Sequence, residues 1–395
     1  MKYLTSSLYN FGELITGGYL YVDKTEYVWK MLQTPREYFF LSRPRRFGKS
    51  LLISTLKAAF EGRRELFKGL ALYDKPYDWK PYPVVHLDLG NRQSDTVEKL
   101  EESLQRGLAI AADQLGIALR GKSAEGQFEN LLYDASKIAP PVVLIDEYDK
   151  PILGNLADRE GVSNILRRLK GFYSVIKTSS PRLRFVFMTG VSKFCHVSVF
   201  SDLNNLTDIT MDARFATMLG YTQEEFEANF AEHLARTEAR QTLPHGEYLA
   251  EIKRWYDGFR FHADAESVYN PVSLANFFLS GGEFNNYWFS TGTPTFLIEL
   301  IKRKKFDFEK ALGEPVGSLA FSAYEVDNLE VLPLLLQTGY LTIRSSRRGI
   351  TGTVYRLDFP NLEVKSAFDC YLLNAYTKLE QVKVENIASL LIQQG

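Results

Sequence analysis

Short runs of apolar residues mark the strands that the chain buries. They span residues 38–41, 84–89, 142–145 and 185–188. The run at 142–145 is too hydrophobic to have a solvent face, so it belongs inside a parallel sheet that is covered on both sides. The sequence therefore predicts a sheet whose strands are largely enclosed by helices.

Helical spacing of apolar residues appears between these runs. Residues 51–60 follow the first strand and are rich in good helix formers. Residues 97–115 place their apolar side chains on one helical face; these are Val97, Leu100, Leu104, Leu108, Ala111 and Leu115. The order strand, helix, strand, helix, strand implies right-handed crossovers and an α/β fold with a parallel sheet.

The pattern changes near Gly220, where mainly helical sequence begins. Thr222 and Glu225 have the spacing of a capping box at a helix start. The chain then is mainly helical to about residue 285, apart from a turn or short hairpin at 255–260, and more helix follows the segment 287–294. We interpret this region as a helical lid.

The remaining sequence predicts a helix at 332–336, two short strands at 339–343 and 354–358, and a helix from 363 to 391. A hairpin with a basic turn after helices is typical of a winged-helix unit, and such units either bind DNA through phosphate contacts or only mediate packing. The predicted division of the chain is a core at 1–219, a helical lid at 220–325, and a winged-helix-like region with a C-terminal helix at 326–395.

Composition and charge narrow the function classes. The chain has 395 residues, of which 45% are hydrophobic and 24% charged, and its formal net charge is −1. These values describe an ordinary folded protein and demand neither nucleic acid nor a membrane. No apolar stretch reaches the ~20 residues that span a bilayer, and Cys195 and Cys370 form no disulfide framework or metal pattern. We expect a cytoplasmic protein without a membrane partner.

The chemistry of the chain begins at the end of its first strand, where Gly48-Lys49-Ser50 opens a helix. In such a loop, backbone N–H groups and the positive helix terminus face nucleotide phosphates, Lys49 reaches the β- and γ-phosphates, and the Ser50 hydroxyl binds Mg²⁺. The usual pattern is G-x-x-x-x-G-K-[ST], and Arg43 occupies the position of its first glycine. The alternative is a helix start with a chance Gly-Lys-Ser. The other candidate nucleotide-binding residues in this loop are Arg46, Phe47 and Leu51.

A second motif follows the strand at 142–145. Asp146 and Glu147 come at its carboxyl end, where α/β sheets bind their ligands. We assign Asp146 to the metal ion and Glu147 to the orientation and deprotonation of the attacking water. Asp149 is a spare acid that we expect to be a solvated loop carboxylate.

Two further segments supply candidates. The strand at 185–188 ends in polar residues, among which Thr189 is the first candidate and Ser192 the second for a group near the γ-phosphate. Lys193 is expected to be an exposed lysine. Residues 19–25 precede the phosphate loop, and a segment in that place often packs beside the adenine, so Asp23 is a candidate; Thr25 is expected to cap a helix.

These motifs together resemble the AAA-ATPase-like proteins of bacteria and archaea, many of which carry a C-terminal PD-(D/E)xK nuclease-like domain. The resemblance rests on the segments 21–25, 43–50, 145–149, 189–194, 200–206, 256–260 and 269–271. It implies an additional-strand P-loop ATPase core that binds ATP, followed by helical and winged-helix extensions. It also implies that Arg43 is a normal feature of the family, and that Gly292 and Pro294 form a turn near the nucleotide. Arg260 is either a phosphate sensor or a surface arginine.

The nuclease-like domain would follow the winged-helix region. Asp358, Glu363 and Lys365 superficially resemble a nuclease triad, but the two acids are too close in sequence to converge on one metal ion. We interpret them as a strand end and a helix start.

The sequence thus predicts a Mg²⁺-dependent ATPase that acts as a nucleotide-driven switch. It would signal to a protein partner, to another copy of itself or to a nuclease-like domain. One alternative is a regulatory scaffold that binds nucleotide with little turnover. Another is a DNA-binding protein that uses the turn at Arg347 and Arg348.

Overall fold

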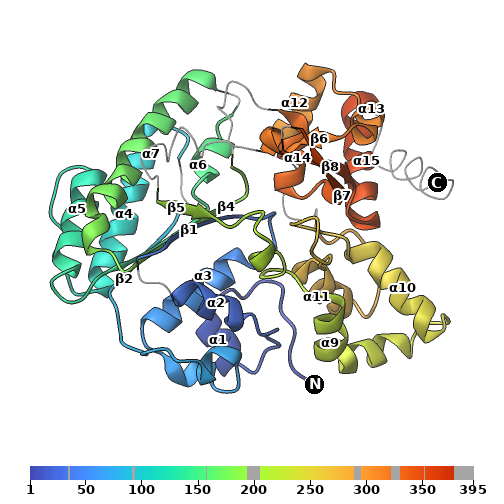
Figure 1. Ribbon diagram of the computed structural model, residues 1–395, viewed down its shortest axis with the longest axis horizontal. Coiled ribbons are helices and arrows are strands. Elements are labelled where there is room, and N and C mark those ends of the chain that lie inside the picture. Colours follow the sequence, from blue (N-terminus) through green and yellow to red (C-terminus); the bar gives the residue numbers. More distant parts are fainter. Residues whose placement is uncertain are drawn as a thin grey trace.

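The computed structural model describes residues 1–33, 36–90, 94–156, 158–193, 205–288, 295–321, 330–350 and 352–377. An α/β unit built around a central sheet contains the described residues up to 219. The described residues from 220 onward form a mainly helical part that packs beside that unit (Figure 1). The predicted α/β fold with a parallel sheet is confirmed.

Five strands of the described chain form the central sheet, and every pairing between them is parallel. The order across the sheet is β2 (Val84–Asp88), β3 (Val142–Asp146), β4 (Phe185–Gly190), β1 (Tyr38–Ser42) and β5 (Leu206–Asp208). Strand β4 therefore lies between β1 and β3, as an additional-strand layout requires. All residues of β1, β3 and β4 are buried, which explains why their sequences lack a polar face.

Helices cover the sheet. Helices α1 (Phe11–Thr16), α2 (Thr25–Leu32) and α3 (Lys49–Phe60) lie on one side, whereas α6 (Lys150–Leu153) and α7 (Arg159–Ser179) lie on the other (Figure 1). Next to α7 pack α4 (Val97–Gln114) and α5 (Ala124–Ala135). Short 3-10 turns connect these elements; they are η1 (Arg64–Phe67), η2 (Ala71–Asp74), η3 (Ser180–Arg182) and η4 (Ala213–Phe215).

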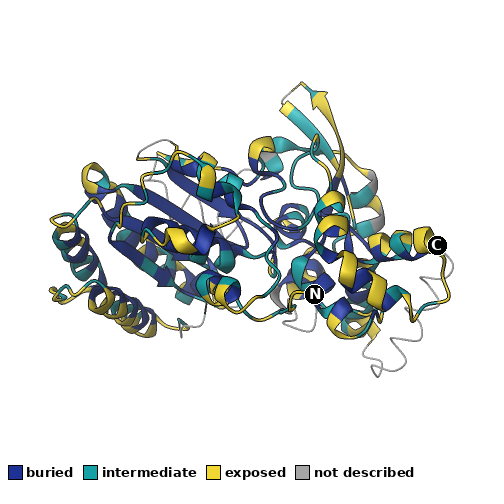
Figure 2. Ribbon diagram, turned by 90° about the horizontal axis from the view of Figure 1, so that it is seen from below, coloured by how far each residue is buried: buried dark blue, intermediate teal, exposed yellow. Residues whose placement is uncertain are grey.

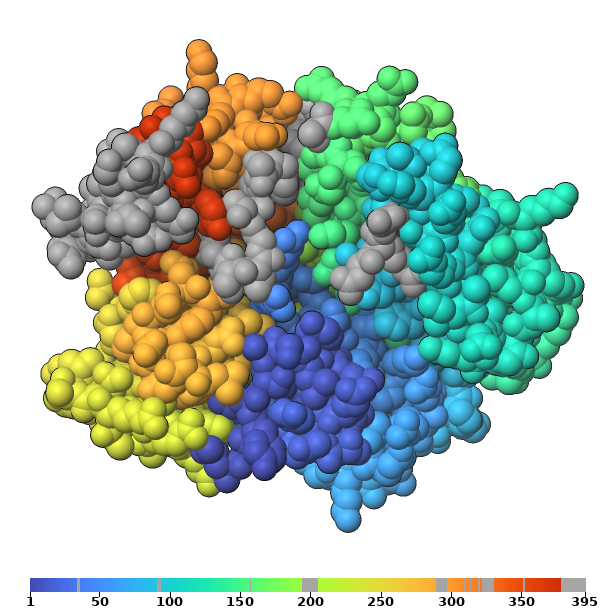
Figure 3. Space-filling view, turned by 180° about the vertical axis from the view of Figure 1, so that it is seen from behind, coloured from blue at the N-terminus to red at the C-terminus, as the bar shows by residue number. Residues whose placement is uncertain are grey.

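A second hydrophobic core lies between α9 (Gln223–Glu238), α10 (His245–Tyr256) and α11 (Pro271–Leu279). Val22 of the N-terminal segment belongs to this core, and the N-terminal residues lie against these helices on the rear face of the molecule (Figure 3). The predicted capping box is confirmed, because the Thr222 hydroxyl accepts from the Glu225 N–H and the Glu225 carboxylate accepts from the Thr222 N–H.

The last described part contains helices and a small antiparallel sheet of order β6-β8-β7. Apolar residues of this part, such as Leu335 and Phe368, belong to the same hydrophobic cluster as the α/β unit. The two parts therefore share one core. The elements of the last described part are α12 (Thr295–Lys304), α13 (Phe308–Gly313), β6 (Val316–Gly317), η6 (Ser318–Phe321), α14 (Val331–Thr338), β7 (Thr342–Gly349), β8 (Gly352–Asp358) and α15 (Leu362–Thr377).

Local predictions had mixed outcomes. Asp358 ends β8 and α15 begins at Leu362, so the strand end and helix start are confirmed; the predicted continuation to 391 lies outside the described residues. Thr25 is the first residue of α2 rather than its cap. None of the described helices combines the length and the apolar character that crossing a bilayer requires.

Candidate functional site

The site begins where β1 passes through a short loop into α3. Two residues of this loop have positive φ angles, namely Arg46 at 67° and Gly48 at 89°. Gly48 precedes the first helical residue and has no side chain with which to cap the helix. The N–H groups of the first turn of α3 therefore remain available to an anion, and the helix dipole favours negative charge there.

Lys49 is held over this loop by its own backbone. Its side chain is 6% exposed, and Nζ donates to the carbonyls of Arg43 at 3.0 Å and Pro44 at 2.9 Å. Burial lowers the pKa of Lys49, and the negative charges of Glu147 and Asp146 oppose that shift. Because an ammonium group has three N–H donors, these two bonds leave a third for a phosphate oxygen.

Asp146 and Ser50 are brought together although they are distant in the sequence. Asp146 ends β3 and its carboxylate is buried, and the Ser50 side chain in the first turn of α3 lies near enough to lower its pKa. Burial raises the pKa of Asp146 to about 6, opposed by the Ser50 side chain and the charge of Lys49. A hydroxyl and a carboxylate side by side are oxygen ligands of the kind that Mg²⁺ prefers, so this pair fits the predicted metal site.

Glu147 adopts a strained backbone, with φ at 50°. Its carboxylate reaches the end of β2, where a Cβ added to Gly90 would lie 2.8 Å from Glu147 Oε2 and 3.1 Å from Asp88 Oδ1. Gly90 therefore makes room for two acids. The positive φ of Glu147 costs a non-glycine residue roughly 1–3 kcal/mol, and backbone strain of this kind is found most often at functional sites.

Asp88 is the acid that the sequence reasoning missed. It ends β2 directly opposite Asp146 in the parallel register, and its negative charge acts on Asp146. A signal was present, since both strands end in aspartate. The pairing of β2 with β3 was needed to bring the two ends together.

Comparison with known proteins agrees with this geometry. A family model described as Predicted AAA-ATPase matches residues 6–200, which include β1, the loop, β3 and β4. A protein of Azotobacter chroococcum mcd 1, named Uncharacterized protein in vnfD 5'region, is 40% identical over 380 residues, or 95% of this chain and 70% of that relative. The chain belongs to the AAA-ATPase-like family.

Arg43 shows how this AAA-ATPase-like protein replaces the first loop glycine. The side chain is fully buried. Its guanidinium donates to the carbonyls of Ser42, Thr210 and Phe215, at 3.0, 2.6 and 3.2 Å, and lies 4.1 Å from the Phe261 ring centre. Burial lowers its pKa to about 9. Arg43 thus fastens the loop to the segment that follows β5.

Phe47 also anchors the loop through its side chain. It is 1% exposed, and its ring contacts Phe259 and Phe261 edge to face at centroid distances of 4.9 and 5.3 Å. Its predicted part in nucleotide binding is therefore limited to its backbone. Arg46 and Leu51 are half-buried in the same loop and helix start.

Asp149 is not the solvated loop carboxylate that we expected. It is 1% exposed, and its Oδ2 accepts from the N–H groups of Val191 at 3.1 Å and Ser192 at 2.8 Å and from the Ser192 hydroxyl at 2.7 Å. Asp149 therefore fixes the end of β4, because the backbone there needs an acceptor once β4 ends. The Ser192 hydroxyl is engaged in the same network.

Thr189 has a partner within the central sheet of this AAA-ATPase-like protein. Its hydroxyl is fully buried and donates to the Leu41 carbonyl at 2.8 Å, so it joins β4 to β1. Lys193 is not exposed either. It is 9% exposed, and its Nζ lies 2.5 Å from Asp208. The expectation for Lys193 was wrong, because its ammonium pairs with Asp208 of β5. The role of Thr189 near the γ-phosphate stays a prediction.

Asp23 is engaged within the N-terminal segment. Oδ1 accepts from the Thr25 N–H and hydroxyl at 2.8 and 2.7 Å, and Oδ2 accepts from the Ala71 N–H at 2.7 Å. Both oxygens thus organise α2 and the turn at Ala71, which disagrees with a direct role at the nucleotide.

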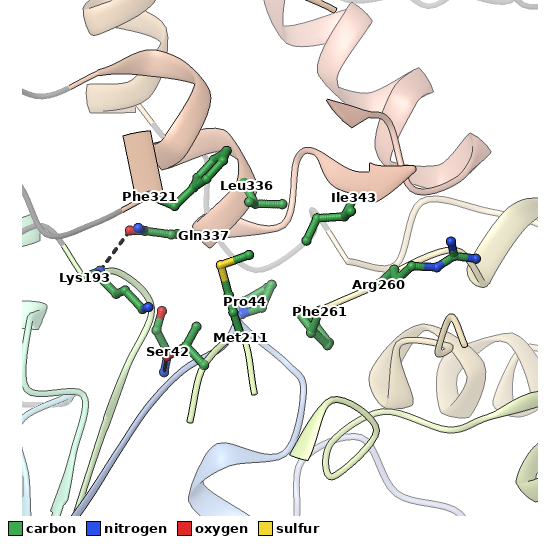
Figure 4. A pocket seen from close by; sticks show the side chains of 11 residues that line it. Ser42, Pro44, Lys193, Met211, Arg260, Phe261, Phe321, Leu336, Gln337 and Ile343 are labelled. Carbon is green, nitrogen blue, oxygen red and sulfur yellow. Dashed lines mark hydrogen bonds between the residues drawn. The ribbon is translucent and has the colours of Figure 1, made fainter. Parts of the chain in front are cut away.

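Arg260 points toward the hairpin, where its Nη1 donates to the Arg344 carbonyl at 3.3 Å. Figure 4 shows its side chain turned away from the other residues of a small pocket. That pocket has a volume of about 30 Å³ and lies between Pro44, Phe261 and Leu336. It is too small for a nucleotide. Gly292 and Pro294 lie outside the described residues.

Proposed function

We propose that this protein is a Mg²⁺-dependent ATPase that works as a nucleotide-driven switch. The observation that carries the proposal is that Ser50 acts on the buried Asp146 carboxylate, beside the Lys49 ammonium at the start of α3. This combination places a cation, a pair of metal ligands and a helix terminus together, as phosphoryl transfer requires.

The residues divide the work as follows. The N–H groups at the start of α3 and the remaining donor of Lys49 bind the β- and γ-phosphates of ATP, and ADP stays bound in the same place. Ser50 and Asp146 would hold Mg²⁺, which neutralises phosphate charge when bound. Glu147 orients the attacking water and accepts its proton. Asp88 and Glu147 both place a carboxylate oxygen near Gly90, so Asp88 adds a second acid to this edge of the sheet.

The switch role draws support from the way the loop is fixed to distant segments. Phe47 packs on Phe259 and Phe261, which follow α10, and Arg43 binds carbonyls after β5. We propose a core at 1–219, a helical lid at 220–325 and a winged-helix-like region at 326–395, with the loop as the junction. The recipient of the signal would be a protein partner, a second copy or a nuclease-like domain.

Isothermal titration with ATP and Mg²⁺, together with phosphate release, tests the proposal. Lys49→Ala is expected to lose binding, because it removes the cation at the phosphates. Glu147→Gln is expected to bind ATP normally and to lose about 10²–10⁴-fold in turnover. Tight binding by Lys49→Ala would refute the phosphate-loop assignment. Binding without turnover in the unmodified protein would favour the nucleotide-binding scaffold instead.

DNA binding is a second candidate, favoured by the β7–β8 hairpin. Residues 342–358 contain four arginines and one aspartate, although the whole chain has a net charge of −1. Arg347, Arg348 and Arg356 are exposed, and Ile350 at the tip is fully exposed. Figure 2 shows the exposed strands of the hairpin projecting from the molecule. Arginines on a projecting hairpin suit the phosphates of a duplex.

Fluorescence anisotropy with labelled duplex DNA at two salt concentrations tests this candidate. Changing Arg347 and Arg348 to Ala is expected to weaken binding and to reduce the slope of log affinity against log salt by about 2. The matched control changes Arg106 and Arg159, which are exposed on α4 and α7. Equal losses in both double variants would refute a specific role for the hairpin.

A further inference from the structure

Trp288 reaches the phosphate loop from outside the α/β unit. Its indole Nε1 donates to the Arg45 carbonyl at 3.2 Å, and the side chain is 7% exposed. Its ring packs against Tyr340 at 5.3 Å and Phe259 at 6.1 Å between ring centres. The indole therefore has a fixed place between the loop and the C-terminal part of the chain, by which we mean α14 to α15, residues 330–377.

This hydrogen bond determines how one peptide group of the loop is turned. A trans peptide is planar, so its C=O and the following N–H point in opposite directions. With the Arg45 carbonyl bound to Trp288, the Arg46 N–H points away from the indole. Arg46 and Gly48 have positive φ angles, and backbone of this kind forms concave nests of N–H groups that bind anions. Trp288 thus stabilises one orientation of the loop's donors.

Glu363 in turn holds Trp288. It is fully buried in the first turn of α15, and its Oε1 accepts from the N–H groups of Tyr287 and Trp288 at 2.8 and 2.9 Å. Its Oε2 accepts from the Ser273 hydroxyl in α11 at 2.8 Å. One carboxylate therefore joins α11, the backbone of Trp288 and α15, and three donors offset the cost of burying it.

Gly339 makes a second contact with the loop. It ends α14 with φ at 87°, and a Cβ added there would lie 2.7 Å from Pro44 Cβ and 3.3 Å from the Trp288 ring. Pro44 is thus packed tightly against the C-terminal part. Its carbonyl also accepts from Lys49, so a shift of the lysine toward a phosphate acts on the same residue.

We propose that Trp288, held by Glu363, is a positioning residue for the phosphate loop, through which the C-terminal part of the chain controls nucleotide affinity. This inference rests on the proposed ATP-binding function. Coupling of this kind is reciprocal, so nucleotide binding also changes how firmly the C-terminal part is held.

Isothermal titration of Trp288→Phe with ADP and ATP in Mg²⁺ tests the inference. Phenylalanine keeps an aromatic ring and removes the N–H. Losing this hydrogen bond is expected to weaken nucleotide binding by about two- to tenfold. The matched control is Trp255→Phe, because the Trp255 indole donates at 3.0 Å to Glu251 within α10. The control is expected to bind as the unmodified protein does.

Rescue separates positioning from general stability. Glu363→Gln retains a carbonyl oxygen for the two backbone N–H groups, so it is expected to keep near-normal affinity. Glu363→Ala removes that acceptor and is expected to match the loss in Trp288→Phe. Thermal unfolding of each variant shows that the protein tested is folded. Equal affinity in Trp288→Phe and Trp255→Phe would overturn the inference.

Hydrogen exchange of residues 43–51, measured without nucleotide, tests the positioning role of Trp288 separately from the proposed ATP binding. Trp288→Phe is expected to speed exchange in this segment relative to Trp255→Phe, since the loop loses its external bond. If the unmodified protein binds no nucleotide, the proposed function fails. In that case, equal exchange of the loop in Trp288→Phe and Trp255→Phe would overturn the positioning role too, whereas faster exchange in Trp288→Phe would support it.

Discussion

Restoring the usual first glycine of the phosphate loop should destabilise this protein. Arg43→Gly gives the chain the full G-x-x-x-x-G-K-S pattern, and the motif alone predicts no harm from it. The structure predicts the opposite. The buried guanidinium donates to the Thr210 and Phe215 carbonyls, which lie beyond β5, so the change removes the bonds that fasten the loop to that segment.

The magnitude follows from these bonds. A hydrogen bond from a charged group contributes about 1.5–3 kcal/mol, so the two bonds together are worth about 3–6 kcal/mol. Burying a cation costs part of that gain, as the lowered pKa of Arg43 shows. We expect the free energy of unfolding to fall by about 2–4 kcal/mol.

Urea unfolding followed by circular dichroism measures this effect. With a slope of about 3 kcal/mol per molar, the midpoint should fall by about 1 M. Arg45→Gly is the matched control, because Arg45 lies in the same loop, is exposed and undergoes the same residue change. Equal midpoints for the two variants would refute the structural role of Arg43. ATP titration of both variants would then show whether Arg43 acts on the nucleotide instead.

Three further changes probe the site and its support. Ser50→Ala should weaken the Mg²⁺ dependence of ATP binding, because it removes the hydroxyl beside Asp146; an unaltered titration would count against a metal role. Asp149→Asn should lower the thermal unfolding temperature, since an amide cannot accept every bond from Val191 and Ser192, at a cost of about 1–3 kcal/mol; an unchanged temperature would contradict this. Burial raises the pKa of Glu363 from 4.5 to about 7. Its stabilising contribution is therefore full below pH 4.5 and lost as the pH rises through about 7. Glu363→Gln should therefore gain stability relative to the unmodified protein as the pH rises over this range. A difference in urea midpoint between the two proteins that is the same at pH 5 and pH 8 would contradict this.

The sequence itself determined the sheet and the edge at which the site lies. Uniformly apolar runs identified β1, β3 and β4, because a strand enclosed on both faces has no polar positions. Gly48-Lys49-Ser50 and Asp146-Glu147 each follow such a strand, and parallel strands place their carboxyl ends at one edge. Chain order and local pattern were therefore sufficient to predict that Ser50 and Asp146 meet.

The tertiary structure alone decided which polar side chains remain available at that edge. Three side chains have the residue types of ligands or loop acids, namely Arg43, Thr189 and Asp149. Each is instead hydrogen-bonded to backbone groups of another segment. Trp288 is remote in the sequence, yet it binds the loop directly. Local sequence cannot foresee these partnerships, because a buried polar group takes whichever partner the packing of distant segments brings within hydrogen-bonding distance.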